Sequence, residues 1–377
     1  LRARLEDAEF FFREDKKVRL YDRISNLKQV VFQERLGSLY DKVQRLKELV
    51  VFIAKEALHE SDKELLENLQ RAAQLCKIDL LTQMVGEFPN LQGIMGAIYA
   101  LGDQENEVVA RAIEEHYMPR FSGDTLPQSL EGSILSVAEK IDNLVSCFAL
   151  DLIPTGSEDP HALRRQTMGI FLIVFDRGLP LLSPDVIRYS LDLLPSSLKA
   201  DKDALEIKIK DFLVQRLENF FLAQEYAYDL VDAVIMTIMT RSFNPIPMQK
   251  QLDALVELRK TPGFTDILIP FKRVINILPA GEDDLSAPDP ALFKESAEKT
   301  LYQRFQEIVS DLEIKIDQGE YRMALEAMTA LKGPIDTFFD EVMVMDKDER
   351  VRNNRLSLLR SIGRIFLKIA DFSKIVT

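Results

Sequence analysis

Apolar residues recur every three or four positions along most of the chain, which is the spacing of one face of an α-helix. Residues 65–80 and residues 128–150 each carry such a face. The apolar positions are Leu65, Leu69, Ala72, Cys76 and Leu80 in the first stretch and Ile134, Ala138, Ile141, Val145 and Phe148 in the second. Ser61 followed by Glu64 has capping-box spacing, so we expect the first of these helices to begin there. Convincing period-2 alternation beside a hairpin turn signal is not found, so the pattern predicts an all-α fold.

Clusters of proline, glycine and acidic residues interrupt the helical pattern and mark candidate domain boundaries. The clearest is residues 279–290, whose three prolines, four acids and one large apolar residue cannot form a packed core. A weaker boundary lies near residues 160–166. The length of 377 residues suits two or three domains. We therefore expect three parts, formed by residues 1–165, 166–284 and 285–377.

The composition is that of a soluble globular protein, with 46% hydrophobic and 29% charged residues and a formal net charge of −13. Collagen-like, disordered and disulfide-stapled chains are excluded. The two cysteines, Cys76 and Cys147, suit a reducing cytosol, so we expect a cytoplasmic protein. The chain opens on Leu1 without an initiator methionine or a signal-peptide pattern, and we expect it to be part of a longer protein. Apolar stretches such as residues 168–175 are far shorter than the ~20 residues of a membrane-spanning helix.

Eight segments spread along almost the whole chain carry a family resemblance. They are Arg2–Asp15, Val31–Lys42, Cys76–Gly96, His116–Asp124, Pro154–Arg165, Asp340–Met345, Asn354–Leu359 and Ala370–Lys374. In this order they resemble segments in the later half of the β subunit of the bacterial heterotetrameric glycyl-tRNA synthetase. Eight matches in one order are highly specific, although the resemblance is weakest in residues 180–290.

The resemblance implies an HD-like helical domain in residues 1–165, a helical linker or body in 166–284, and an anticodon-binding (DALR-like) helical bundle in 285–377. In that family the α subunit activates glycine with ATP and the β subunit supplies tRNA binding. The resemblance therefore implies part of a ligase that joins glycine to tRNA(Gly), with the α subunit as partner in an α2β2 heterotetramer. It implies ATP and glycine at the α subunit, and neither a cofactor nor a membrane or DNA partner for this fragment.

The HD-like domain raises the question of metal chemistry, because HD enzymes bind divalent metal through histidines and aspartates. The resemblance places Cys76 and Lys77 at the His-Asp pair, Lys42 near the first-helix ligand, and Asp142 at a later acid that is retained. A cationic lysine has no lone pair to give a metal and repels the ion. We therefore expect no metal and no catalytic residue in this fragment. The alternative, an HD-type metal-dependent phosphohydrolase, requires a divalent ion at Asp142.

A net-acidic chain binds RNA only if its positive charge is segregated. Residues 350–370 contain six basic residues and no acid. Projected at 100° per residue, most of these cations fall opposite the apolar face and predict an outward cationic stripe. The stripe comprises Arg350, Arg360, Arg364 and Lys368. Arg355 projects on the apolar side, where we expect it to reach the rim or pair with an acid such as Asp340.

Further RNA contacts are weaker candidates. Arg352, with Phe338 and Phe339, offers a platform for unstacked bases. Arg164 and Arg165 follow a loop and could bind tRNA, or pair with the acids of that loop. His116, Tyr117 and Arg120 could stack on RNA, or His116 could simply be a packed helix terminus. A helical assembly scaffold without RNA affinity is a further alternative for the whole chain.

Overall fold

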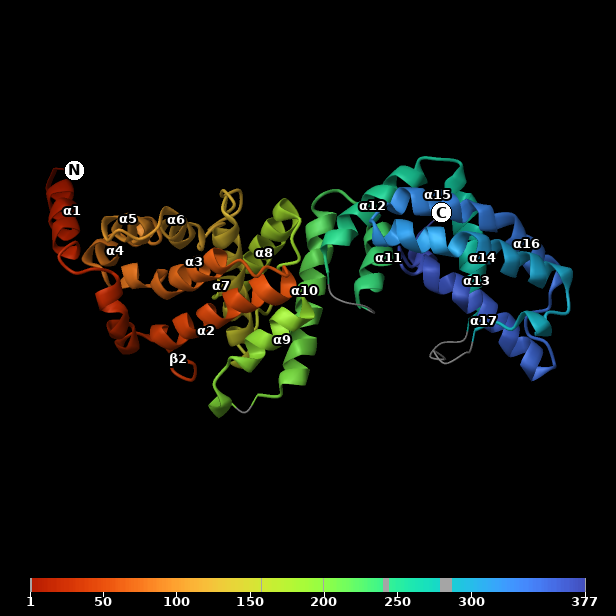
Figure 1. Cartoon of the computed structure of the whole chain (residues 1–377), viewed down its shortest axis with the longest axis horizontal. Helices are drawn as coiled ribbons and strands as arrows, with labels where there is room; N and C mark the ends of the chain where they lie inside the picture. The colour runs from red at the N-terminus through yellow and green to blue at the C-terminus, as the bar shows by residue number, and fades with distance from the viewer. Residues whose placement is uncertain (1, 157, 199, 240–243, 279–286, 377) are drawn as a thin grey trace. The chain divides into compact units, whose positions relative to one another are not determined.

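The computed structural model describes residues 2–156, 158–198, 200–239, 244–278 and 287–376 (Figure 1). The all-α prediction is confirmed, with one short hairpin among the described residues. Most of the predicted linker, residues 279–290, lies outside the described residues. None of the described helices has the length and apolarity needed to cross a membrane.

The chain forms two compact units instead of the three predicted parts. Unit 1 comprises residues 1–217 with 243–245, and unit 2 comprises residues 218–242 and 246–377. The division falls near residue 217, inside one long helix. No division falls near residue 165, because the helices Leu130–Ala149 and Leu163–Arg177 pack against one another. A helical connection carries no proline or glycine cluster, so the boundary near residue 217 has no punctuation signal in the sequence.

Unit 1 is built from ten helices and a hairpin among the residues described. Its helices are α1 (Arg2–Asp15), α2 (Leu39–Phe52), α3 (Lys63–Leu75), α4 (Gln83–Glu87), α5 (Ile94–Gly102), α6 (Glu107–Glu115), α7 (Leu130–Ala149), α8 (Leu163–Arg177), α9 (Pro184–Asp192) and most of α10 (Lys202–Leu222). Short 3-10 segments lie at Tyr21–Gln29, Ile78–Leu81, Pro89–Leu91 and Ser196–Leu198, and a π-helical turn at Ile53–Ala57. Helix α7 is the centre of the unit, because α2, α3, α6, α8 and α9 all pack against it.

The predicted apolar faces are the core of unit 1. All five apolar positions predicted for residues 128–150 are buried on α7. On α3, Leu69 and Ala72 are buried, as is Cys76 at its end. The cap prediction is wrong by one residue: Asp62, not Ser61, accepts a hydrogen bond from the N–H of Leu65, at 3.0 Å. Aspartate, like serine, is a preferred N-cap residue, so Asp62 caps this helix one residue after the predicted position.

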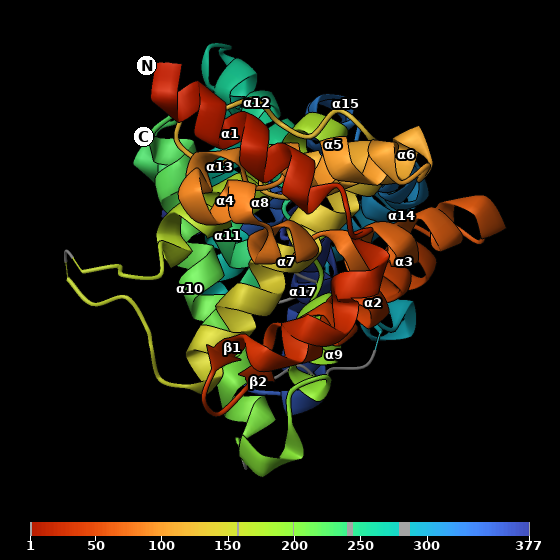
Figure 2. The same ribbon diagram turned by 90° about the vertical axis from the view of Figure 1, so that its left-hand side faces the viewer.

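A two-stranded hairpin precedes α2 and was not predicted. Strands β1 (Val31–Gln33) and β2 (Gly37–Ser38) are antiparallel, and Figure 2 shows them beside the start of α2. Gly37 has φ +90°, a conformation that favours glycine. Ser38 and Asp41 then form a capping box that starts α2. Strands of two or three residues are too short to produce a recognisable alternation.

Unit 2 is a helical bundle. Its helices are α11 (Tyr228–Met239), α12 (Ile246–Arg259), α13 (Gly263–Ile277), α14 (Ser296–Asp317), α15 (Tyr321–Met328), α16 (Lys332–Glu341) and α17 (Glu349–Phe366), with 3-10 turns at Pro290–Leu292, Thr329–Leu331 and Phe372–Lys374. Helix α17 packs against both α13 and α14. The aromatic centre is Phe271, whose ring centroid lies 4.7 Å from that of Phe366 and 4.8 Å from that of Phe372.

Candidate functional site

Unit 1 brings together the four positions that the resemblance aligns with HD metal ligands, of which only Asp142 is expected to keep the ligand residue. Lys42 lies on α2, Cys76 and Lys77 follow the end of α3, and Asp142 lies on α7. All four are buried. Lys42 Nζ donates to Oδ2 of Asp142 at 2.8 Å, so two positions related only by resemblance in the sequence are in direct contact.

Asp142 is held by two cations. Arg45, one turn along α2 from Lys42, donates from Nε to Oδ1 of Asp142 at 2.7 Å and from Nη2 to Oδ2 at 3.1 Å. Burial acts to raise the pKa of Asp142, but Lys42 and Arg45 outweigh it and lower that pKa. The carboxylate therefore stays charged, and both its oxygens are occupied by cationic donors.

Glu139, one turn before Asp142 on α7, holds the second lysine. Lys77 Nζ lies 3.0 Å from Oε1 of Glu139, and Lys42 Nζ lies 3.5 Å from Oε2. Burial acts to raise the pKa of Glu139, but the two lysines lower it well below its usual range. Two buried carboxylates and three buried cations thus form one connected cluster, which we call the ion cluster (Lys42, Arg45, Lys77, Glu139 and Asp142).

His116 closes the ion cluster as a neutral ring. Lys77 Nζ lies 3.0 Å from Nε2, and Nδ1 lies 2.5 Å from the carbonyl oxygen of Ile113. Because the ammonium can only donate, Nε2 accepts and Nδ1–H donates. Burial and then Lys77 lower the pKa of His116 well below its usual value. His116 is fully buried, so it is a packed helix terminus and offers no face to RNA.

The donor set does not fit a divalent metal. The ammonium groups of Lys42 and Lys77 lie among the carboxylates, in the position that a metal ion would need. Burial raises the pKa of the Cys76 thiol to about 12, so it is not a thiolate ligand at neutral pH. No group of three or more His, Cys, Asp or Glu side chains among the described residues is arranged to hold a metal ion.

A cavity of about 390 Å³ opens beside the ion cluster. Glu139 and His116 line it from the cluster, and Lys140 lines it from the same helix. Two predicted RNA contacts, Arg120 and Arg165, also line this cavity, although the sequence did not relate them to the HD-like positions.

The three predicted RNA contacts of unit 1 differ in how free they are. Arg120 pairs with Asp124, with Nε 3.0 Å from Oδ2. Arg164 donates from Nη2 to the carbonyl oxygen of Gly156 at 2.7 Å, so it holds the loop through a carbonyl rather than through an acid. Arg165 is exposed and has no ion pair among the residues described. Of the three, Arg165 is therefore the side chain most open to a phosphate.

The predicted cationic stripe on α17 is interrupted, which corrects the sequence interpretation. Arg360 is only 7% exposed, and its Nη1 is buried without a hydrogen-bond partner. Lys368 pairs with Glu313, with Nζ 2.6 Å from Oε1. Arg350 and Arg364 remain exposed. Helix α17 is covered by α13 on one side and α14 on another, so a projection that assumes one buried face misplaces residues between them.

Arg355 is a structural residue, as expected, but its predicted partner is wrong. Its Nε donates to Oε1 of Glu298 at 2.8 Å, and its Nη1 donates to Asp346 at 3.0 Å. Asp340 instead pairs with Arg273, whose Nη2 lies 3.3 Å from Oδ1 of Asp340. The glutamate is completely buried, so the pair joins α17 to α14 inside the bundle.

The predicted base-stacking platform is only partly available. Phe338 is buried and Phe339 is half-buried, with the guanidinium of Arg273 4.9 Å from its ring centroid. Arg352 is half-buried, and its Nη2 lies 3.7 Å from Oε1 of Glu349. A surface pair of this kind contributes little, so Arg352 can still exchange its partner for a phosphate.

Sequence reasoning missed Arg45, Glu139 and Lys140. The first two complete the ion cluster, and the third lines the cavity. A signal was present: Arg45 follows Lys42 by three residues, and Glu139 precedes Asp142 by three, so each pair shares a helix face. Charged pairs on an otherwise apolar face indicate buried ion pairs.

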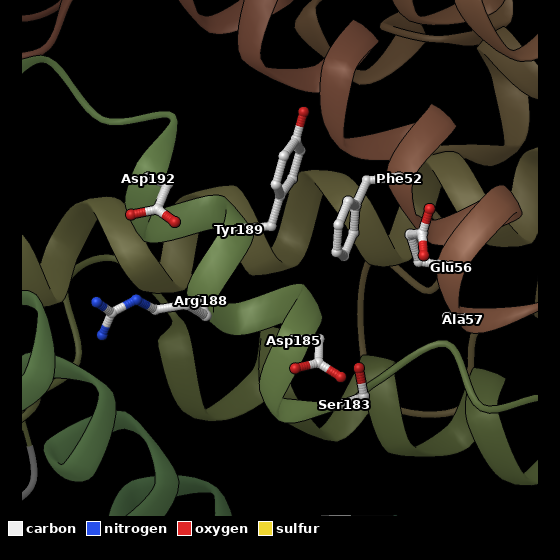
Figure 3. Close-up of a pocket in the computed structure, with 8 residues that line it drawn as sticks. All are labelled: Phe52, Glu56, Ala57, Ser183, Asp185, Arg188, Tyr189 and Asp192. Carbon is white, nitrogen blue, oxygen red and sulfur yellow. The ribbon is translucent and has the colours of Figure 1, made fainter.

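Another cavity of unit 1, of about 330 Å³, has a different chemistry (Figure 3). The rings of Phe52 and Tyr189 stack within it, with centroids 4.0 Å apart. Glu56 and Asp185 line it with exposed carboxylates, while Arg188 points away from the Phe52 ring (Figure 3). Exposed acids repel phosphate, so this cavity does not suit RNA.

Comparisons with known proteins divide the chain in a similar way. Residues 1–236 match the family described as glycyl-tRNA synthetase beta subunit. Residues 267–373 match the DALR anticodon binding domain. The second match covers most of α13 and all of α14 to α17.

Similar curated proteins are glycine--tRNA ligase beta subunits. That of Syntrophus aciditrophicus is 42% identical over 377 residues, which are 100% of this chain and 53% of that protein. That of Trichlorobacter lovleyi is 43% identical over 376 residues, with the same coverage of both chains. The chain thus spans about half the length of the curated relatives it matches.

Proposed function

Because the chain belongs to the family of glycyl-tRNA synthetase β subunits, we propose that it is a tRNA-binding part of a glycine–tRNA ligase. The observation that carries the proposal is the match of residues 267–373 to an anticodon-binding domain. These residues all lie within one compact helical unit.

The proposed RNA contact on unit 2 starts from the exposed end of α17. Arg350 lies in the first turn of that helix and is exposed, and Arg352 lies half a turn further on. Arg364, near the other end of α17, is exposed as well. Guanidinium groups bind phosphate through two parallel hydrogen bonds, which makes arginine well suited to this role. Arg360 is not part of this proposed contact because it is buried. Lys368 can bind a phosphate only if its ion pair with Glu313 breaks.

Unit 1 is proposed to take no chemical part in the reaction. Each carboxylate of its ion cluster is held by lysine or arginine. The phosphohydrolase alternative would need a carboxylate or imidazole free for a metal ion, and the ion cluster offers neither. Arg165 is a second proposed contact for the tRNA backbone.

For the whole enzyme, we propose the arrangement that the family resemblance implies. An α subunit activates glycine with ATP, the β subunit holds tRNA(Gly), and two copies of each form a cytoplasmic heterotetramer. No cofactor is assigned to this chain, and neither DNA nor a membrane is a proposed partner. The purified chain is accordingly expected to form no glycyl-tRNA by itself.

The test is a competition binding assay with the 377-residue chain. A fluorescent tRNA(Gly) transcript is bound first, and an unlabelled anticodon stem–loop is added as competitor. The stem–loop is expected to displace the transcript at low salt. Arg350→Glu should weaken stem–loop binding, whereas Arg35→Glu, the same change at an exposed arginine of unit 1, should not. A scaffold without RNA affinity would bind neither RNA, and equal effects of the two variants would remove Arg350 from the contact.

A further inference from the structure

The cavity beside the ion cluster has the size of a small-molecule site. Its volume of about 390 Å³ lies within the range of ~300–1,000 Å³ that is usual for ligand pockets, and it far exceeds a single phosphate group. Its lining includes the ring-bearing residues Pro119, Pro160 and His161. All lining residues belong to unit 1.

Positive charge exceeds negative charge around this cavity. The ion cluster itself contains three cations and two carboxylates, so it leaves one positive charge uncompensated. Arg165 adds an exposed cation without an ion pair among the described residues, and Arg120 is balanced by Asp124. A positive surplus inside a concave, partly desolvated site favours an anionic ligand.

Lys140 and Arg165 reach the cavity from neighbouring helices. Lys140 on α7 packs against Gly169 of α8, where a Cβ atom would lie 3.0 Å from Cε of Lys140. Arg165 precedes Gly169 by four residues and so lies on the same face of α8. Lys140 Nζ donates to the carbonyl oxygen of Met118 at 2.8 Å and to Oγ of Ser136 at 2.6 Å. A charged ammonium has three N–H groups, so one remains for a ligand.

Two residues that line the cavity have buried polar atoms without a hydrogen bond. They are Oε2 of Glu139 and the hydroxyl of Tyr117. Glu139 is only 8% exposed, and its Oε2 lies 3.5 Å from Nζ of Lys42. Buried polar atoms are nearly always hydrogen-bonded, so two such atoms at one cavity indicate a polar occupant. A carboxylate oxygen accepts, so the occupant must carry a hydroxyl or amino donor as well as its anion.

We propose that this cavity binds a phosphate monoester of nucleotide size, with its phosphate between Arg165 and Lys140 and a hydroxyl or amino group donating to Oε2 of Glu139. This inference goes beyond the proposed tRNA-binding role, whose main contact is on unit 2, and it assigns the second proposed contact, Arg165, a small-molecule ligand as well. Binding is non-covalent and leaves the ligand unchanged.

Binding is also expected to depend on pH, since Lys140 must be charged to hold the phosphate. Burial lowers the pKa of Lys140 to about 7, with Glu139 acting in the opposite direction. The charged groups around it are Glu139, Lys77, Asp124 and Arg165, beside the neutral ring of His116. A phosphate dianion stabilises the protonated amine, so binding takes up a proton and weakens as pH rises from about 7 to about 9.

The test is isothermal titration calorimetry of the 377-residue chain, without RNA, with AMP and separately with inorganic phosphate. AMP is expected to bind, and Arg165→Ala to weaken it about tenfold, the value of one charge-assisted hydrogen bond. Arg35→Ala, an exposed arginine outside the cavity, is the matched control and should bind as the unaltered chain does. Lys140→Met should bind weakly and lose the pH dependence.

The outcomes separate the sources of the phosphate. Tighter binding of AMP than of inorganic phosphate supports a ligand of nucleotide size, and equal binding of the two probes contradicts it. The proposal is overturned if neither probe binds at millimolar concentration, or if Arg165→Ala and Arg35→Ala bind AMP equally. Either failure would leave tRNA binding by unit 2 untouched, because the titration contains no RNA.

Discussion

At the scale of single residues, the positions that the resemblance aligns with HD metal ligands lie among internal ion pairs. Lys42 and Lys77 put ammonium groups beside Asp142 and Glu139, where they neutralise the carboxylates as a bound cation would. The sequence predicts that these lysines exclude a metal, and that expectation stays a prediction. It could not predict the partners, because Arg45 and Glu139 become significant only once α2, α3 and α7 are packed together.

Removing one lysine should show how much the ion cluster contributes to the free energy of unfolding. Lys77→Met leaves Glu139 with a buried, poorly paired charge, and we expect the free energy of unfolding to fall by about 3–5 kcal/mol. Urea denaturation at neutral pH measures this. Lys63→Met is the control, because its side chain is 89% exposed and the change should stay within about 0.5 kcal/mol. Equal small effects of both variants would show that the ion cluster contributes little stability.

Lys140 predicts how stability varies with pH. Burial lowers its pKa to about 7 in the folded protein, while the unfolded value is near the ordinary 10.5. From pH 7 upwards the unfolded chain therefore binds a proton that the folded chain lacks, and Lys140 favours folding increasingly, by at most about 1.4 kcal/mol per pH unit. Between pH ~7 and ~9, the unfolding free energy of the unaltered chain should thus rise relative to that of Lys140→Met. A pH-independent difference would contradict the lowered pKa.

At the scale of helices, periodicity predicted α3 and α7 correctly, and all five apolar positions predicted for α7 are buried. The same method failed for α17. Helices α13 and α14 cover two sides of it, so Arg355 and Arg360 are both buried, although the sequence projection placed them on opposite faces. Projection of a single helix contains no information about how many neighbours that helix has.

The two buried arginines of α17 should respond differently to the same substitution. Arg355→Met leaves Glu298 buried without its cation and should cost about 3–5 kcal/mol of unfolding free energy. Arg360→Met removes a guanidinium whose Nη1 has no partner and keeps an apolar stem, so it should change stability by less than about 1 kcal/mol. Thermal unfolding compares the two variants, and equal losses would contradict these assignments.

At the scale of the whole molecule, a chain of net charge −13 is proposed to bind a polyanion. The predicted cationic stripe on α17 is interrupted, and exposed cations such as Arg350 lie near ion pairs such as that of Arg352 with Glu349. Family membership and the anticodon-binding match now carry the RNA proposal, since the charge pattern alone does not. The sequence identified the family because eight segments matched in order, whereas the contact residues depend on packing that no segment encodes.

The most direct test is the affinity of the chain for tRNA(Gly) over a salt series, measured by filter binding. We predict binding at low salt that falls linearly on a log–log plot, with Arg350→Ala reducing the slope by about one. Absence of binding at the lowest salt concentration, or an affinity that does not change with salt, would contradict the account.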